Sequence, residues 1–153
     1  DLYSTHQRLL VKYLMQTTGN VIELGSGFYS TPIMHEITQY QCRHLYTIDN
    51  NKDWLQLFKS FESPLHTIRF LHRWTAFQPE CRYGLAFVDH ADPPSHPRWL
   101  QVEKLIPHSD IIIIHDTEDT QYGYSNIMDR VDVIDECKAH RTQTMVLKPK
   151  DND

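Results

Sequence analysis

The sequence contains few cysteines, and their arrangement does not define a disulfide framework or a thiolate metal site. Its three cysteines, Cys42, Cys81 and Cys137, are odd in number, far apart and without a C-x-x-C spacing. This usage indicates a reducing compartment, and we expect a cytoplasmic protein. The sequence has no apolar run near the roughly 20 residues that a membrane-spanning helix needs. It also shows no leader in which charged residues precede an apolar stretch, so we expect no membrane partner.

Clustered positive charge is also scarce. The 15 Lys and Arg residues are outnumbered by 20 Asp and Glu, which gives a formal net charge of −5 at pH 7. Nucleic-acid binding depends on grouped Lys and Arg that neutralise phosphates, so we expect no nucleic-acid partner and a small-molecule or sugar substrate instead. The length of 153 residues predicts a single domain over residues 1–153, without a separate substrate domain, and leaves a homodimer open.

Strand-like apolar runs and helical stripes alternate along most of the chain. The strand-like runs are 21–24, 44–48, 67–71, 85–89, 111–114 and 145–147. Stripes at helical spacing fall within 9–14, 33–40, 54–61 and 99–106, the first after a capping-box pattern at 4–7. The four isoleucines of 111–114 are typical of a central parallel strand buried on both faces. We therefore predict an α/β three-layer sandwich, with a Rossmann-like, mostly parallel sheet of about six to seven strands and helices on both faces.

A glycine-containing loop follows the first strand-like run. Glu23-Leu-Gly-Ser-Gly27 precedes a helix that begins near Ser30, and its two glycines allow a sharp turn and a close approach to a ligand. Asp49 ends the next run, where a ribose would meet a carboxylate. The pattern favours an adenosine-type cofactor, although a simple tight turn is the alternative. The expected cofactor-binding residues are Glu23, Gly25, Ser26, Gly27, Asp49 and Asn50.

The acid before the loop favours S-adenosylmethionine among such cofactors. The Glu23 carboxylate can help to hold the cationic methionine end, whereas it would repel the pyrophosphate of a dinucleotide. Ser30 stands where a nicotinamide-binding loop would have a third glycine. Trp74, after the third strand-like run, is expected to flank the adenine.

Two later strand-like runs share one design, an apolar strand that ends in an acid beside a histidine. They end in Asp89-His90 and His115-Asp116. If the strands are neighbours, the two acids converge, and they repel each other unless a cation, a proton or a basic group lies between them. We expect Asp89 and Asp116 to bind a divalent metal, Mg²⁺ or Ca²⁺. The alternative is that the acids only bond to nearby backbone amides.

The histidines allow a second kind of metal site. His90, His96 and His115 with Asp92 would suit zinc, although no H-x-H or H-E-x-x-H spacing occurs. Three prolines stiffen this loop, so that Arg98 is expected to lie over a pocket with Asp92 and His96. The remaining histidines are interpreted as structural or surface groups: His6, His35, His44, His66, His72, His108 and His140.

From Thr5 to about Leu147, the chain resembles the class I S-adenosylmethionine-dependent methyltransferases. The resemblance rests on the loop 23–27, Asp49, the 88–90 motif and the 114–117 motif. The last two motifs are similar to those of the metal-dependent catechol O-methyltransferase-like and sugar O-methyltransferase groups, in which two acids hold Mg²⁺. The resemblance implies O-methylation of a small molecule or sugar, although Thr117 stands where the family usually has an Asn ligand.

Methyl transfer requires close alignment of the nucleophile with the methyl group, and a hydroxyl gains from losing its proton. The expected catalytic residues are Asp89 with His90 or His115 as the proton acceptor. Tyr122 and Tyr124, in the segment 119–141, are expected to form part of the substrate wall, unless the segment is only a crossover helix. The alternatives are a cofactor-binding or partner module without turnover, and a nicotinamide-dependent oxidoreductase or epimerase, although no Y-x-x-x-K pair occurs.

Overall fold

A computed structural model describes residues 4–91, 96–138 and 141–150. These residues form a seven-stranded sheet with the strand order β3-β2-β1-β4-β5-β7-β6. The strands are β1 (Asn20–Leu24), β2 (Leu45–Asp49), β3 (His66–Phe70), β4 (Tyr83–Val88), β5 (Ser109–His115), β6 (Val131–Cys137) and β7 (Thr144–Pro149). Strands β1 to β5 pair in parallel, whereas β7 is antiparallel to both β5 and β6. The strand order reverses between β1 and β4, the position at which α/β sheets bind ligands.

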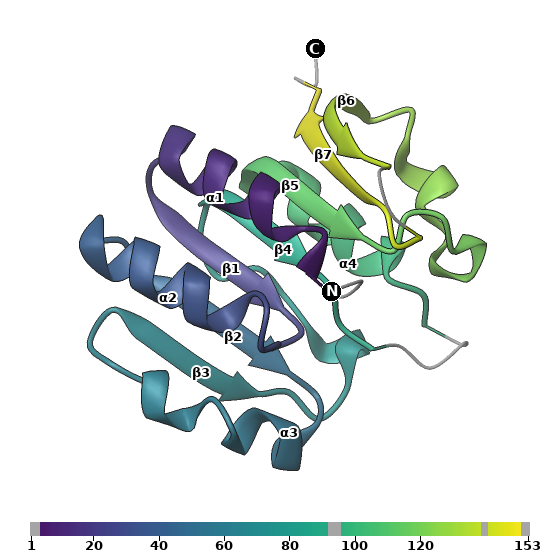
Figure 1. Ribbon diagram of the computed structural model, residues 1–153. Coiled ribbons are helices and arrows are strands. Elements are labelled where there is room, and N and C mark those ends of the chain that lie inside the picture. The colour runs from purple at the N-terminus through teal and green to yellow at the C-terminus, as the bar shows by residue number, and fades with distance from the viewer. Residues whose placement is uncertain (1–3, 92–95, 139–140, 151–153) are drawn as a thin grey trace.

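Helices cover both faces of the sheet (Figure 1). The α-helices are α1 (Gln7–Gln16), α2 (Thr31–Tyr40), α3 (Lys52–Gln56) and α4 (Trp99–Leu105). Helices α1 and α2 lie together on one face, and α4 lies on the other. Short 3₁₀ helices are η2 (Lys59–Phe61), η3 (Trp74–Ala76), η4 (Ile106–His108), η5 (Thr120–Tyr122) and η6 (Tyr124–Ile127). None of the helices described is long and apolar enough to cross a membrane.

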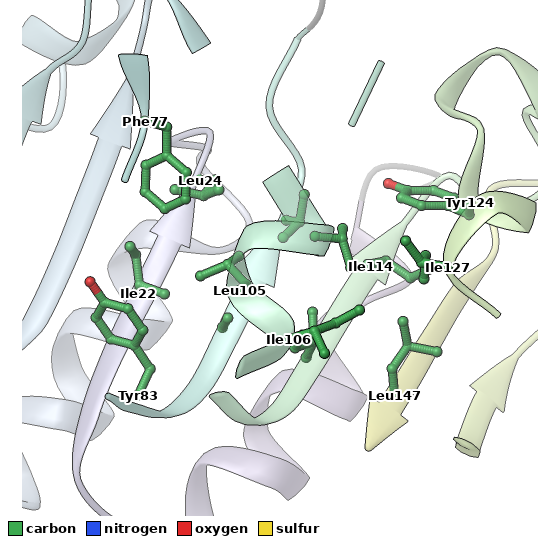
Figure 2. Packing of buried hydrophobic residues seen from close by; sticks show 14 of the residues in the cluster. Ile22, Leu24, Phe77, Tyr83, Leu105, Ile106, Ile114, Tyr124, Ile127 and Leu147 are labelled. Carbon is green, nitrogen blue, oxygen red and sulfur yellow. The ribbon is translucent and has the colours of Figure 1, made fainter. Parts of the chain in front are cut away.

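The alternation of side chains along each strand fills two cores. On one face, Ile112 and Ile114 pack with Leu105 of α4, in the cluster that Figure 2 shows around Ile22, Leu24 and Leu147. On the other face, Ile113 packs with residues of α1 and α2. Burial of each such side chain contributes about 1.5 to 3 kcal/mol. The isoleucine run therefore lies in the sheet interior, as its pattern predicted.

One local prediction, the capping box, was wrong. Helix α1 follows the predicted pattern, but its N-cap is His6, which makes no side-chain capping bond, and Thr5 bonds to His115 instead. The alternative for the segment 119–141, a crossover helix, does not hold for its described part. This part forms η5, η6 and the antiparallel strand β6, because the chain pairs with β7 at the sheet edge.

At the amino ends of the parallel strands, the backbone of β4 lies very close to the backbone of the loop before β1. A Cβ on Gly84 of β4 would lie 1.7 Å from the Thr18 carbonyl oxygen. The neighbouring Arg43 side chain is buried and donates hydrogen bonds to the carbonyls of Leu14 and Gly19. These bonds link the end of α1 to the residue before β1. The contact with Thr18 leaves no space for a side chain at Gly84.

We expect Gly84→Ala to lower the free energy of unfolding by at least about 3 kcal/mol, because the added methyl group collides with backbone. The matched control is Gly19→Ala. There the Cβ has no neighbour closer than 3.8 Å, and only the φ of +79° is unfavourable, at a cost of about 1 to 2 kcal/mol. Urea unfolding of both variants measures the difference, and an equal or smaller loss for Gly84→Ala would contradict the steric explanation.

Candidate functional site

Two neighbouring cavities lie at the carboxyl ends of the parallel strands. The first, here called the His6 cavity, has a volume of about 360 Å³ and is lined by His6, 26–30, Trp54, Asp89, His115 and Asp116. The second, the Asp49 cavity, has a volume of about 290 Å³ and is lined by Gly25, Ser26, 49–51, Trp54, Asp89 and Ala91. Ser26, Trp54 and Asp89 line both cavities. The loop after β1 thus separates two spaces that meet at the same three side chains.

The glycine loop is packed tightly against the end of β4. Gly25 has a φ of +92°, and a Cβ there would lie 2.5 Å from the Cα of His90. Its N–H donates to the carbonyl of Ile48. The first glycine is therefore required by the close approach of two chain segments, which brings the loop next to Asp89.

Glu23 lies beneath this loop and is completely buried. Its carboxylate accepts hydrogen bonds from the hydroxyls of Ser30 (2.6 Å), Thr31 (3.0 and 3.1 Å) and Thr47 (2.7 Å). Burial raises the pKa of Glu23 to about 7, although these three hydroxyls act in the opposite direction. Glu23 lines neither cavity. In this conformation the Glu23 carboxylate stabilises the loop and the start of α2 through these hydrogen bonds.

Asp49 is one of the two acids that line the Asp49 cavity, with Asp89. Asp49 Oδ2 accepts hydrogen bonds from the Ser26 N–H (2.8 Å) and the Ser26 hydroxyl (2.9 Å), and Asp49 Oδ1 accepts one from the Asn51 N–H (2.8 Å). Asn50 lines the same cavity. The structure therefore places Gly25, Ser26, Asp49 and Asn50 around one cavity. Gly27 lies on the other side of the loop, in the His6 cavity.

The two strand-end acids converge, with a buried arginine between them. The Arg98 side chain is only 4 % exposed, and its Nη2 lies 3.3 Å from Asp89 Oδ1 while its Nη1 lies 3.2 Å from Asp116 Oδ2. The Arg98 guanidinium also lies 3.9 Å from the centre of the Tyr122 ring. A basic group therefore supplies the counter-charge that the acids require. Asp89 and Asp116 do not fit the expected Mg²⁺ site, because the guanidinium already occupies the position between them.

His115 is the second positive group of this cluster. Its Nδ1 lies 2.9 Å from Asp116 Oδ1 and 3.4 Å from Asp89 Oδ1. Burial alone would lower the pKa of His115, but its contacts with the carboxylates of Asp116 and Asp89 outweigh burial and raise the pKa to about 9. His115 is therefore protonated at neutral pH. It is suited to stabilising negative charge rather than to accepting a proton.

Two predicted site residues face the protein core instead. His90 is 1 % exposed, and its ring centre lies 4.0 Å from that of Trp74. Its Nε2 lies 3.3 Å from Gln101 Oε1, and the Trp74 indole donates to the carbonyl of Ala91. Neither His90 nor Trp74 lines the His6 cavity or the Asp49 cavity. Both side chains lie between the end of β4 and the residues of η3 and α4, and in this conformation they do not face the two cavities.

The other residues of the predicted zinc site and substrate wall are also arranged differently. His96 contacts Gln101, with 2.6 Å between its Nε2 and Gln101 Nε2, while Asp92 lies outside the described residues. Tyr124 is buried in the core and its hydroxyl donates to the carbonyl of His115. Tyr122 contacts Arg98 and lines neither cavity. One tyrosine thus stabilises the strand end, and the other covers the arginine.

Several residues that line the two cavities were not predicted from the sequence, among them His6 and Trp54. His6, interpreted from the sequence as structural, is 2 % exposed, lines the first cavity and meets the His115 ring edge-on at 4.7 Å between ring centres. Trp54 of α3 lines both cavities and donates from its indole N–H to the Ser26 carbonyl. Trp54 belongs to an ordinary helical stripe, and no spacing in the sequence places the start of α1 beside the end of β5.

We expect Glu23→Gln to remove a specific pH dependence of stability. The Glu23 pKa rises from 4.5 to about 7 on folding, so the folded protein keeps a proton that the unfolded chain loses in this window. Stability therefore falls as the pH rises from about 4.5 to 7, by roughly 2 to 4 kcal/mol from this group. Gln cannot titrate, so the difference between variant and wild type should grow over that window.

Urea unfolding at pH 5, 6, 7 and 8 tests this expectation. The control is Glu62→Gln, because the Glu62 side chain is 44 % exposed and makes only a surface ion pair with Lys59. Its pH profile should run parallel to that of the wild type. A parallel profile for Glu23→Gln as well would show that the buried carboxylate does not titrate in this range.

Comparison with solved structures identifies proteins with a similar fold. An O-methyltransferase from Bacillus cereus in complex with S-adenosylhomocysteine matches with a TM-score of 0.66 and 15% identity, over 93% of this chain and 79% of that one. A ribosomal protein L11 methylase from Lactobacillus delbrueckii subsp. bulgaricus matches with a TM-score of 0.66 and 10% identity, over 99% and 80%. The 16S rRNA methylase ArmA matches with a TM-score of 0.54 and 11% identity, over 97% and 83%.

No protein-family model matches the sequence, and neither does a curated protein. At 10–15% identity, the structural matches establish the fold alone. The seven-stranded, mostly parallel sheet with helices on both faces agrees with the predicted fold class. The chain has a Rossmann-like α/β fold, which it shares with these methyltransferase structures.

Proposed function

We propose that this protein is an S-adenosylmethionine-dependent methyltransferase that methylates a hydroxyl group of a small molecule or sugar. The observation that carries the proposal is the pair of cavities that meet at Ser26, Trp54 and Asp89, at the carboxyl edge of the sheet. A methyl donor and an acceptor need two adjoining spaces with a common boundary. In this proposal the adenosine part lies in the Asp49 cavity, and the acceptor enters the His6 cavity.

The hydrogen bonds of Asp49 support the position of the cofactor. A carboxylate has about four lone-pair sites, and three protein donors reach the oxygens of Asp49. One site remains for a ribose hydroxyl, and rotation of the Ser26 hydroxyl would release a second. The two backbone N–H donors meanwhile fix the orientation of the carboxylate.

The walls of the His6 cavity support a small acceptor. Its volume of about 360 Å³ falls within the usual range of small-molecule sites. Phe28 and Trp54, with 5.2 Å between their ring centres, form an aromatic part of the lining, and Asp89, His115 and Asp116 form a charged part. An acceptor with an apolar face and a hydroxyl group matches this division. Two of the structural relatives are named as methylases of a ribosomal protein and of rRNA, so those acceptor classes belong in the test.

The charged part of the lining supports a division of roles in the reaction. The bound cofactor supplies an electrophilic methyl group, and the acceptor oxygen forms a bond to carbon while the carbon–sulfur bond breaks. Asp89, which lines both cavities, accepts the hydrogen bond of the acceptor hydroxyl and takes its proton. Protonated His115 stabilises the negative charge that develops on the oxygen, while Arg98 keeps the Asp89 carboxylate in place.

We expect Asp49→Ala to weaken binding of S-adenosylhomocysteine by about tenfold to more than a hundredfold, because two ribose hydroxyls lose their acceptor. The matched variant is Ser26→Ala. It removes a hydroxyl that competes for Asp49 and leaves the carboxylate, so affinity should stay within about threefold. Isothermal titration calorimetry measures both, with NAD as the comparison ligand. Unchanged affinity in Asp49→Ala, or tighter binding of NAD, would sink the assignment of this cavity.

We expect Asp89→Asn to lower methyl transfer by about 10² to 10⁴-fold, because the amide cannot take the proton of the acceptor. Calorimetry with S-adenosylhomocysteine checks that the cofactor site of the variant is intact. Transfer from radiolabelled S-adenosylmethionine is measured against panels of phenols, sugars, RNA and protein. Transfer only to RNA or protein would overturn the small-acceptor assignment. Cofactor binding without transfer to any panel would indicate a binding or partner module.

A further inference from the structure

Three side chains at the floor of the His6 cavity come from three different elements. Among the described residues, His6, Asp89 and His115 form one group whose ligand atoms all lie within 4.8 Å of one another. His6 is the N-cap of α1, Asp89 follows β4, and His115 ends β5. Both histidines are nearly completely buried. Because both rings are buried, each ring nitrogen can point in only a few directions.

The hydrogen bonds of His6 determine which of its nitrogens is available. His6 Nε2 lies 3.3 Å from the carbonyl oxygen of Tyr29. A carbonyl oxygen only accepts, so Nε2 carries the hydrogen and Nδ1 of the neutral ring has a lone pair. This Nδ1 is buried, and no described residue offers it a hydrogen bond. A buried lone pair without a donor is costly unless a Lewis acid or a ligand binds to it.

His115 is oriented in a matching way. Its Nε2 lies 3.2 Å from the Thr5 hydroxyl, which in turn lies 3.1 Å from the Thr142 hydroxyl. The Nδ1 of His115 therefore faces the carboxylates of Asp89 and Asp116. Metal-binding histidines usually hold the remote ring nitrogen in a hydrogen bond to a carbonyl or another polar group. Both His6 and His115 have this second contact.

The ligand chemistry distinguishes this group from an oxygen-rich site. Two imidazoles and one carboxylate are the ligands of borderline divalent metals such as Zn²⁺, and three protein ligands leave a position open. Bond lengths near 2.1 Å would require separations of about 3.4 Å between ligand atoms, so the group would have to draw together slightly. The Asp89 side chain is 26 % exposed, more than either histidine, and it would have to turn from Arg98 toward the two rings. Arg98 would continue to neutralise Asp116.

We propose that His6, Asp89 and His115 form a binding site for one divalent transition metal of the zinc class, open toward the His6 cavity. The site shares Asp89 and His115 with the proposed methyl transfer, and it differs from a pair of acids around Mg²⁺. Asp116 remains the partner of Arg98. The metal would take the place of the proton that lies between His115 and the two carboxylates.

The test begins with Zn²⁺ alone and the metal-free protein. Calorimetry should show one Zn²⁺ per chain. His6→Ala should weaken binding by at least about 100-fold, and Thr5→Val, which removes the remote partner of His115, by about 10 to 100-fold. The matched control is His72→Ala, an exposed histidine away from both cavities, with binding within about threefold of the wild type. Equal affinity in His6→Ala and the wild type would overturn the proposal.

A second measurement on the wild type does not depend on how well any variant folds. X-ray absorption spectroscopy of the Zn²⁺-loaded protein should show nitrogen and oxygen ligands with two imidazoles. Sulfur in the coordination shell would assign binding to the free thiols of Cys42, Cys81 or Cys137 and would contradict the site. Failure to bind Zn²⁺, with S-adenosylhomocysteine still bound, would refute this inference and leave the proposed function intact.

Discussion

The buried carboxylate of Glu23 is the contact on which the arrangement of the site depends. Its hydrogen bonds join β1 to β2 through Thr47 and to the start of α2 through Ser30 and Thr31. A buried acid is tolerated only where such donors surround it. Because Thr31 also accepts the Gly27 N–H, the glycine loop is fixed at both its ends. The boundary between the two cavities follows from this buried contact.

Arg98 has the corresponding role on the other side of the strand reversal. It bonds to the backbone of His90 and His115 as well as to the two acids. Asp116 has a φ of +56°, an unfavourable backbone conformation for a residue with a Cβ, and the surrounding contacts hold it there. The charges at this edge are therefore positioned by one planar cation rather than by the strands alone. Removing that cation would leave two carboxylates in repulsive proximity.

Features that follow from local pattern could be predicted from the sequence, and features that depend on distant contacts could not. The isoleucine run and the glycine loop fixed the sheet centre and the ligand edge, because strand burial and turn geometry are local. Strand β6 was missed since its alternation is interrupted by a bulge between Val133 and Asp135. His90 was expected to face the site, but its side chain lies against Trp74 and Gln101. His6 reaches the His6 cavity only because α1 docks onto the sheet. Neither orientation has a signal in residue spacing.

The hydrogen-bonded row of Thr5, His115 and Thr142 joins segments from nearly the whole chain, since Thr5 and Thr142 are 137 positions apart. During synthesis, the first of these residues leaves the ribosome long before the last. Helix α1 and the early strands can form while the ring of His115 still lacks its full support. The floor of the His6 cavity is thus completed only after Thr142 has been translated. Until then, a nascent chain would lack a site that is competent to bind a ligand.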